Sequence, residues 1–238
     1  MVSLMSKMGY KVISESVLLF PTLITVGKRE VDELEKESWF SAYLEQSDKD
    51  GKSNESTGHQ SVHHDIRFKK VFSDIAGTIR NHLKTLGIDT SMIEVYIQKS
   101  FFNVKTNTGN PKHNHVESHI SFTYYPHIHK SRSQQLIFYQ DRGKVSNDIY
   151  EHFVESNARE WHDINASSYS LPVSEGDIFV FPSKLVHSVT NEGGAESFKT
   201  IEELKLSRFC VVGDVVLTRK DTKSYDRLLM PIENWRKF

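Results

Sequence analysis

Short segments with the residue types of β-strands recur through the second half of this sequence. Apolar and β-branched residues alternate or cluster in them, and turns containing Gly, Pro, Asn and Asp separate them. We expect strands at residues 93–105, 120–125, 135–139, 168–171, 177–181, 188–191 and 206–217. Many short strands at such spacing are typical of a β-sandwich or a β-barrel. The fold class predicted from this pattern is therefore mainly β.

The part of the chain before residue 90 has a helical pattern. Residues 66–86 carry apolar residues at spacings of three and four, which predicts an amphipathic helix, and Gly87 follows it as a stop signal. Residues 29–45 mix apolar residues with Glu and Lys and are also expected to be helical. We expect the helix at residues 66–86 to pack on the outside of the sheet.

The order of elements, helices first and strands afterwards, indicates one β domain with an N-terminal helical flank. We expect a single domain over residues 1–238, because β-sandwiches and barrels of this length are often one unit. The helical flank is expected at about residues 27–90 and the β core at about residues 93–220.

Three segments outside these elements have looser patterns. Residues 11–26 are rich in β-branched and apolar types and predict one or two further strands. Residues 46–60 are polar and contain two glycines, which predicts a loop. Residues 140–165 are expected to form a second loop, with a short helix or a lid at residues 147–162. Both loops are expected at the rim of a binding site, where loops commonly set specificity.

The composition is that of an ordinary soluble chain. Of its 238 residues, 37% are hydrophobic and 26% are charged, and the net charge is −1. This balance gives no sign of binding to nucleic acid or to an anionic membrane surface. The apolar run at residues 17–26 is broken by Pro21 and is too short to span a bilayer. The one cysteine, Cys210, lies in an apolar stretch, so we expect a buried thiol and a cytoplasmic protein.

Histidine is concentrated in one stretch, with five of the 12 histidines within residues 113–129. Positions 113, 115, 117 and 119 share parity, so on an extended strand their side chains would project from one face. Imidazole is the commonest metal ligand, and a non-haem Fe(II) site usually adds a carboxylate to two histidines. Two ligands on this strand can therefore be His113 with His115, His113 with Glu117, or His115 with Glu117. The usual carboxylate favours Glu117.

A third ligand has to come from a distant strand that folds back beside the first. The candidate is His187, which follows a turn at Gly176-Asp177, a buried strand at residues 178–181 and a break at Pro182. A His-x-His pair combined with this distal element predicts a metal site. Zinc is the less expected metal, because structural zinc sites usually have Cys ligands.

Five places in the sequence resemble the motifs of a known family. They are Leu19-Phe-Pro-Thr22, Ser100-Phe-Phe-Asn103, His113-Asn-His115 with Ser121-Phe-Thr-Tyr-Tyr125, Gly176-Asp177 through Phe181-Pro-Ser183 to His187, and Arg208-Phe-Cys-Val-Val212. Over about residues 18–217 the chain resembles the 2-oxoglutarate/Fe(II)-dependent oxygenases common in marine bacteria and phages, which are distantly akin to prolyl 4-hydroxylases.

The resemblance implies a double-stranded β-helix, or jelly roll, and a dioxygenase that hydroxylates an unidentified substrate. That substrate would be a prolyl or other peptide side chain, or a small molecule. Fe(II) would be held by His113, His115 and His187, so the resemblance favours the His-x-His pair over Glu117, and it implies no catalytic residue beyond these ligands. Dioxygen and 2-oxoglutarate would be the partners, and a phage-encoded chain would act in the host cytoplasm.

Four residues are candidates for binding 2-oxoglutarate under this resemblance. Arg208 matches the family's arginine, and a planar guanidinium suits bidentate binding of the distal carboxylate. Asn103 and Tyr125 are expected to donate hydrogen bonds to the co-substrate. Ser121 shares a strand face with Tyr125 and is expected in the same pocket.

The chain departs from the family's pattern at several points. Val116 stands where the family has Pro, Phe122 stands where it has Gly, and the interval before Arg208 is longer, with an insertion at residues 192–205. Residues 176–191 also match most of the second cupin motif. The alternatives are therefore a cupin-type metalloenzyme that does not use 2-oxoglutarate and a non-enzymatic jelly-roll binding module.

Overall fold

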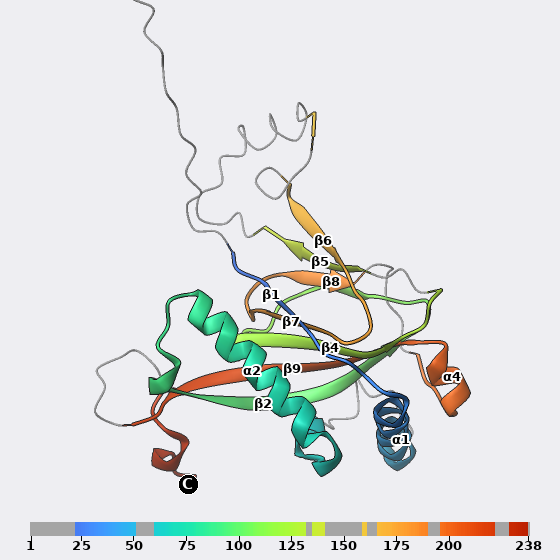
Figure 1. The fold of residues 1–238 in the computed structure, drawn as a ribbon, viewed down its shortest axis with the longest axis horizontal. Coiled ribbons are helices and arrows are strands. Elements are labelled where there is room, and N and C mark those ends of the chain that lie inside the picture. Colours follow the sequence, from blue (N-terminus) through green and yellow to red (C-terminus); the bar gives the residue numbers. More distant parts are fainter. Residues whose placement is uncertain are drawn as a thin grey trace, which may run out of the picture.

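The strands of this chain form two antiparallel sheets, with helices along one side of the larger sheet (Figure 1). The computed structural model describes residues 22–50, 60–131, 135–140, 159–160, 166–189, 196–221 and 229–237. The lid expected at residues 147–162 lies outside the described residues, apart from residues 159–160. The motif residues 19–21 also lie outside them.

The larger sheet has five strands, in the order β1-β7-β4-β9-β2. In that order they are β1 (Thr25–Lys28), β7 (Asp177–Pro182), β4 (Ile120–Ile128), β9 (Arg208–Arg219) and β2 (Ile93–Lys105). Every neighbouring pair in this sheet is antiparallel, and strands far apart in the sequence lie side by side.

The smaller sheet has four strands, in the order β3-β8-β5-β6. They are β3 (Asn110–His113), β8 (His187–Val189), β5 (Gln135–Tyr139) and β6 (Ser168–Pro172). The chain crosses between the two sheets repeatedly, for example from β3 to β4 and from β7 to β8. Two antiparallel sheets connected in this way form a jelly roll, so the predicted mainly β jelly-roll fold is confirmed. The strands predicted at residues 93–105 and 135–139 have the predicted bounds.

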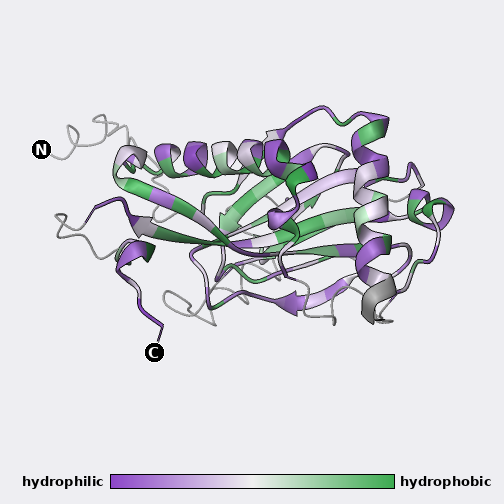
Figure 2. Ribbon diagram, turned by 90° about the horizontal axis from the view of Figure 1, so that it is seen from below, coloured by the Kyte–Doolittle hydropathy of each residue, from purple (hydrophilic) through white to green (hydrophobic). Residues whose placement is uncertain are grey.

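The two long helices lie where the sequence predicted them, before the β core, and are α1 (Glu33–Asp50) and α2 (Lys69–Thr85). The 3-10 turns η1 (Val62–His64), η2 (Ile66–Phe68) and η3 (Thr90–Met92) also precede the core. The short α4 (Ile201–Lys205) lies between β8 and β9, and the 3-10 turn η4 (Ile232–Asn234) follows β9. Figure 2 shows hydrophilic and hydrophobic residues interspersed along the long helices. None of the helices in the described ranges is long and apolar enough to span a membrane.

The helix α1 is longer than expected, because residues 46–50 are helical and not part of a loop. Polar residues do not by themselves end a helix, and the hydroxyl of Ser47 donates to the carbonyl of Tyr43 one turn earlier. The insertion expected at residues 192–205 contains α4, which begins with a capping box between Thr200 and Glu203.

Residue parity divides the strands of the larger sheet between two apolar clusters. One face packs against α1 and α2, and its buried strand residues include Phe122, Tyr124, Ile178, Val180, Phe209, Val211 and Val215. The opposite face packs against the smaller sheet through Tyr125, Phe179, Phe181, Cys210 and Val212. Since strand side chains alternate between faces, each of β4, β7 and β9 is buried on both sides. The second face is the one that can line a site between the sheets.

The turn before β7 depends on Gly176, which has a φ of 85°. Its amide donates to the carbonyl of Tyr125, and its carbonyl accepts from the amide of Arg29, so the turn joins β1, β4 and β7. A Cβ at this position would lie 2.1 Å from the carbonyl oxygen of Arg29. Only glycine therefore fits both the backbone conformation and the space.

We expect Gly176→Ala to destabilise the protein by about 2–4 kcal/mol, because it adds a positive-φ penalty to a backbone clash. The matched control is Gly77→Ala in the middle of α2, where a Cβ would meet no atom within 4 Å. That change should stabilise the protein by roughly 0.5–1 kcal/mol, since alanine favours helix more than glycine does. Urea unfolding of both variants measures the two effects, and equal stabilities would contradict the assignment of the turn.

Candidate metal centre

Three histidines from two far-apart segments converge at one end of the space between the sheets. His113 ends β3 and His187 begins β8, and the two residues are cross-strand partners. His115 follows β3, and its amide donates to the carbonyl of Ser183. One ligand nitrogen from each ring lies within 4.8 Å of the others, an arrangement that could hold a metal ion.

Glu117, the alternative second ligand, lies outside this cluster. The parity argument assumed that residues 113–119 are extended, but the strand β3 ends at His113 and a turn at Val116 and Glu117 follows. The parity argument from an extended strand was therefore wrong beyond His113. The Glu117 side chain is 69% exposed and lies 3.6 Å from Nζ of Lys99.

Each ring of the cluster directs its Nδ1 at an oxygen that can only accept a hydrogen bond. His113 Nδ1 donates to the Pro111 carbonyl at 2.7 Å, and His187 Nδ1 donates to the Leu185 carbonyl at 2.8 Å. His115 Nδ1 lies 3.0 Å from Oδ2 of Asp214. A protonated Nδ1 leaves the lone pair of a neutral ring on Nε2, and this is how metal-binding histidines are usually oriented.

Two further observations fit a metal ion at this position. His115 Nε2 is buried and has no hydrogen-bond partner among the described residues, which is costly unless another group binds it. Burial lowers the pKa of His187 to about 4, although its bond to the Leu185 carbonyl opposes this, so its ring is neutral near pH 7. Neutral imidazole is the form that binds metal.

Asp214 is the residue of this centre that sequence reasoning missed. Its carboxylate is 1% exposed and accepts hydrogen bonds from Ser121 Oγ at 2.6 Å, Lys99 Nζ at 2.9 Å and His115 Nδ1. Burial alone would raise the pKa of Asp214, but the bonds from His115, Ser121 and Lys99 hold it at about 2. The available signal was an acidic residue among the otherwise apolar residues 209–217, which belong to β9.

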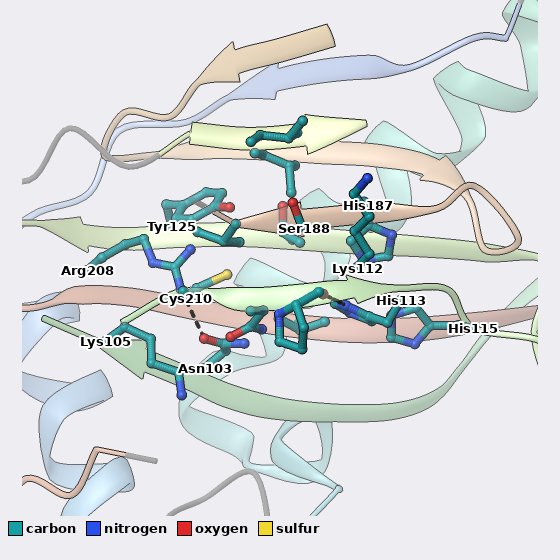
Figure 3. A pocket seen from close by; sticks show the side chains of 18 of the residues that line it. Asn103, Lys105, Lys112, His113, His115, Tyr125, His187, Ser188, Arg208 and Cys210 are labelled. Carbon is teal, nitrogen blue, oxygen red and sulfur yellow. Dashed lines mark hydrogen bonds between the residues drawn. The ribbon is translucent and has the colours of Figure 1, made fainter. Parts of the chain in front are cut away.

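A cavity of about 1050 Å³ opens beside the three histidines. Figure 3 shows His113 and His115 toward one end of it and Arg208, Asn103 and Tyr125 toward the other. The lining contains all three histidines and these three predicted co-substrate residues, with apolar walls from Phe101, Leu136, Val189, Cys210 and Val212. The structure therefore brings six of the residues predicted from sequence into one space.

The guanidinium of Arg208 is buried at the end of the cavity away from the histidines. The residue is 1% exposed, and its Nη2 donates to Oδ1 of Asn103 at 3.0 Å. Its Nε has no hydrogen-bond partner, and no carboxylate of the described residues forms an ion pair with it. A buried cation with so few partners is costly, so this end of the cavity is suited to an anion.

The other two predicted co-substrate residues lie differently. Tyr125 lines the cavity and is fully buried, which raises the pKa of its hydroxyl. Ser121 is buried on the same strand but is not among the residues that line the cavity. Its hydroxyl lies 2.6 Å from Asp214 and 3.1 Å from Ser183, so it supports the carboxylate behind His115.

Residues 101–201 match the model of a protein family described as "Putative 2OG-Fe(II) oxygenase". The matched segment is less than half of the chain. It begins in β2, includes all three clustered histidines and ends at the start of α4, before Arg208. No curated protein matches the chain.

Solved structures resemble this fold at low sequence identity. The non-haem α-ketoglutarate-dependent epimerase SnoN from nogalamycin biosynthesis is 10% identical, covers 86% of this chain and 83% of its own, and has a TM-score of 0.50. EctD from S. alaskensis, solved with 2-oxoglutarate and 5-hydroxyectoine, is 15% identical, with 82% and 72% covered and a TM-score of 0.49. A prolyl-4-hydroxylase from Pseudomonas putida is 9% identical, with 82% and 92% covered and a TM-score of 0.44. The likeness to SnoN supports the fold alone.

We expect the purified protein to bind one Mn(II) ion, and we expect His115→Ala and His187→Ala to weaken this binding by at least about 100-fold. Glu117→Gln is the matched control, because Glu117 is exposed and outside the cluster. It should bind Mn(II) like the unaltered protein in isothermal titration calorimetry. A large loss of affinity in Glu117→Gln, with none in His115→Ala, would restore the carboxylate alternative.

Proposed function

We propose that this chain, which carries a 2OG-Fe(II) oxygenase domain, is a 2-oxoglutarate-dependent dioxygenase that hydroxylates its substrate. Fe(II) and 2-oxoglutarate are the cofactor and co-substrate of the family whose model it matches. The observation that carries the proposal is one cavity with a cluster of three histidines toward one end and a buried arginine toward the other.

The histidine cluster supplies the metal ligands in this proposal. His113, His115 and His187 would hold Fe(II) through their Nε2 atoms, since each Nδ1 is bonded to an oxygen. Bound Fe(II) supplies the activation of dioxygen, with two electrons from the oxidative decarboxylation of 2-oxoglutarate. Three protein ligands would leave positions for 2-oxoglutarate and dioxygen.

Arg208 is the proposed anchor for the distal carboxylate of 2-oxoglutarate. A guanidinium offers parallel N–H donors that match a carboxylate, and burial strengthens the interaction. Asn103 fixes the orientation of the guanidinium through the bond from Nη2, which leaves the buried Nε for the carboxylate. The hydroxyl of Tyr125 is the second proposed donor to the co-substrate.

The apolar residues between these two ends have a separate role. Phe101, Leu136, Val189 and Val212 line the cavity, so they exclude water from the reacting groups. The exclusion of water limits side reactions of activated oxygen with solvent and strengthens the electrostatic contacts to the co-substrate.

Hydroxylation is the proposed outcome, although the fold also occurs in the epimerase SnoN. One oxygen atom of O2 would enter a C–H bond of the substrate, and the other would enter succinate as 2-oxoglutarate loses CO2. This reaction needs no additional carboxylate from the protein, and no Asp or Glu is among the described residues that line the cavity. The substrate would be a peptide side chain or a small molecule.

We expect the protein with Fe(II) and 2-oxoglutarate, prepared without oxygen, to show a weak visible charge-transfer band. Arg208→Ala should raise the dissociation constant for 2-oxoglutarate on the order of 100-fold, because it removes a buried charged partner. The same variant should bind Mn(II) within about threefold of the unaltered protein, since Arg208 is not in the histidine cluster.

Two results would contradict this proposal. One is the absence of the band in the unaltered protein when Mn(II) binding is intact. The other is substrate turnover that does not change when 2-oxoglutarate is omitted, which would favour the cupin-type metalloenzyme. The variant Arg208→Lys tests the effect of charge separately from that of geometry, because lysine keeps the positive charge but lacks the planar pair of N–H donors of the guanidinium.

A further inference from the structure

The three clustered histidines are oriented by two different kinds of partner. His113 and His187 each donate from Nδ1 to a backbone carbonyl two residues earlier in the chain, at Pro111 and Leu185. His115 instead bonds to the side chain of Asp214, 99 residues later. The orientation of His115 therefore depends on a side chain. Of the three partners, this is the one that a substitution can remove, because the other two are backbone carbonyls.

The charge of the centre is also unusual for a non-haem Fe(II) site. Such sites commonly have two histidines and one carboxylate, which brings a negative charge to the metal. The cluster here consists of three imidazoles, and the neighbouring Glu117 is exposed and lies outside it. The buried carboxylate of Asp214 lies directly behind one of these imidazoles.

The larger sheet holds Asp214 rigidly in this position. Asp214 on β9 is the register partner of Lys99 on β2 and of Ser121 on β4, and it bonds to both side chains. Residues directly opposite on neighbouring strands project from the same face. The two cross-strand donors fix the carboxylate, and its Oδ2 then faces His115.

We infer that Asp214 is a positioning residue of the metal centre. It keeps His115 protonated at Nδ1, and it places a negative charge behind that imidazole, where it substitutes for the charge that a carboxylate ligand would bring to the metal. This inference rests on the proposed function only in that the cluster binds a divalent metal. Carboxylate–histidine–metal arrangements strengthen metal binding, and loss of the outer partner commonly costs 10–100-fold in affinity.

The substitution Asp214→Asn tests the charge while it preserves the shape. The amide oxygen can still accept from His115, and the amide nitrogen can donate to the hydroxyl of Ser121, which can rotate to accept it. Lys99 would keep Glu117 as a partner. We expect Mn(II) to bind Asp214→Asn about 10–100-fold more weakly, as measured by calorimetry.

The matched control is Glu117→Gln, which also removes one negative charge but lies on the surface outside the cluster and leaves the contact of Asp214 with His115 in place. It should bind Mn(II) within about threefold of the unaltered protein. The Co(II)-loaded forms give a second readout. The visible ligand-field spectrum should change in Asp214→Asn and stay unchanged in Glu117→Gln, whereas a purely structural role of Asp214 would alter neither spectrum.

The outcomes separate this inference from the proposed function. If the unaltered protein binds no Mn(II), both fail. If it binds Mn(II) and a folded Asp214→Asn binds equally well, the inference on Asp214 is overturned and the proposed function stands. If Asp214→Asn does not fold, long-range ¹⁵N–¹H spectra of the unaltered apoprotein decide the matter. Protonation of His115 at Nδ1 supports the inference, and protonation at Nε2 overturns it.

Discussion

The pairing of β9 between β2 and β4 is the constraint on which the rest of this structure depends. Alternate residues of β9 project into the space between the sheets, from Arg208 through Cys210 and Val212 to Asp214. At about 3.4 Å per residue, the two charged residues lie roughly 20 Å apart along the strand. One strand therefore carries both the buried arginine at one end of the cavity and the carboxylate behind the histidine cluster at the other, at a fixed distance.

The two charges on this strand are compensated to different degrees. Asp214 accepts hydrogen bonds from Lys99, Ser121 and His115, so its burial is well supported. Arg208 has only the amide oxygen of Asn103 as a hydrogen-bond partner among the described residues. Burial of an incompletely paired ion costs on the order of several kcal/mol. Such a cost is expected at a binding site, where the ligand provides the missing partner.

The layered construction explains how the fold tolerates this cost. The outer face of the larger sheet forms an extensive apolar core with α1 and α2, in which Trp39 stacks on Phe68. The inner face has a smaller apolar cluster beside the cavity. The helical side contributes most of the hydrophobic burial, so the side between the sheets can keep an open cavity with buried polar and charged groups.

Much of this architecture could be predicted from the sequence alone. Period-two patterns and turn residues predicted β2 and β5 with their observed bounds, and the apolar spacing before Gly87 predicted α2. These signals are local, since they depend on neighbours within one strand or helix. The residue pattern predicted ligands at residues 113–117 and at His187, whereas the choice of His115 over Glu117 and the assignment of Arg208 came from the family resemblance. The structure brings the three histidines and Arg208 to one cavity.

The position of the supporting residues was decided only by the tertiary structure. A turn after His113 moved Glu117 to the surface, and the register of β4 against β9 placed Ser121 beside Asp214 and outside the cavity. Asp214 meets His115 across 99 residues of chain. Such contacts depend on the register between distant strands and on the exact end of a strand, and local residue patterns do not contain that information.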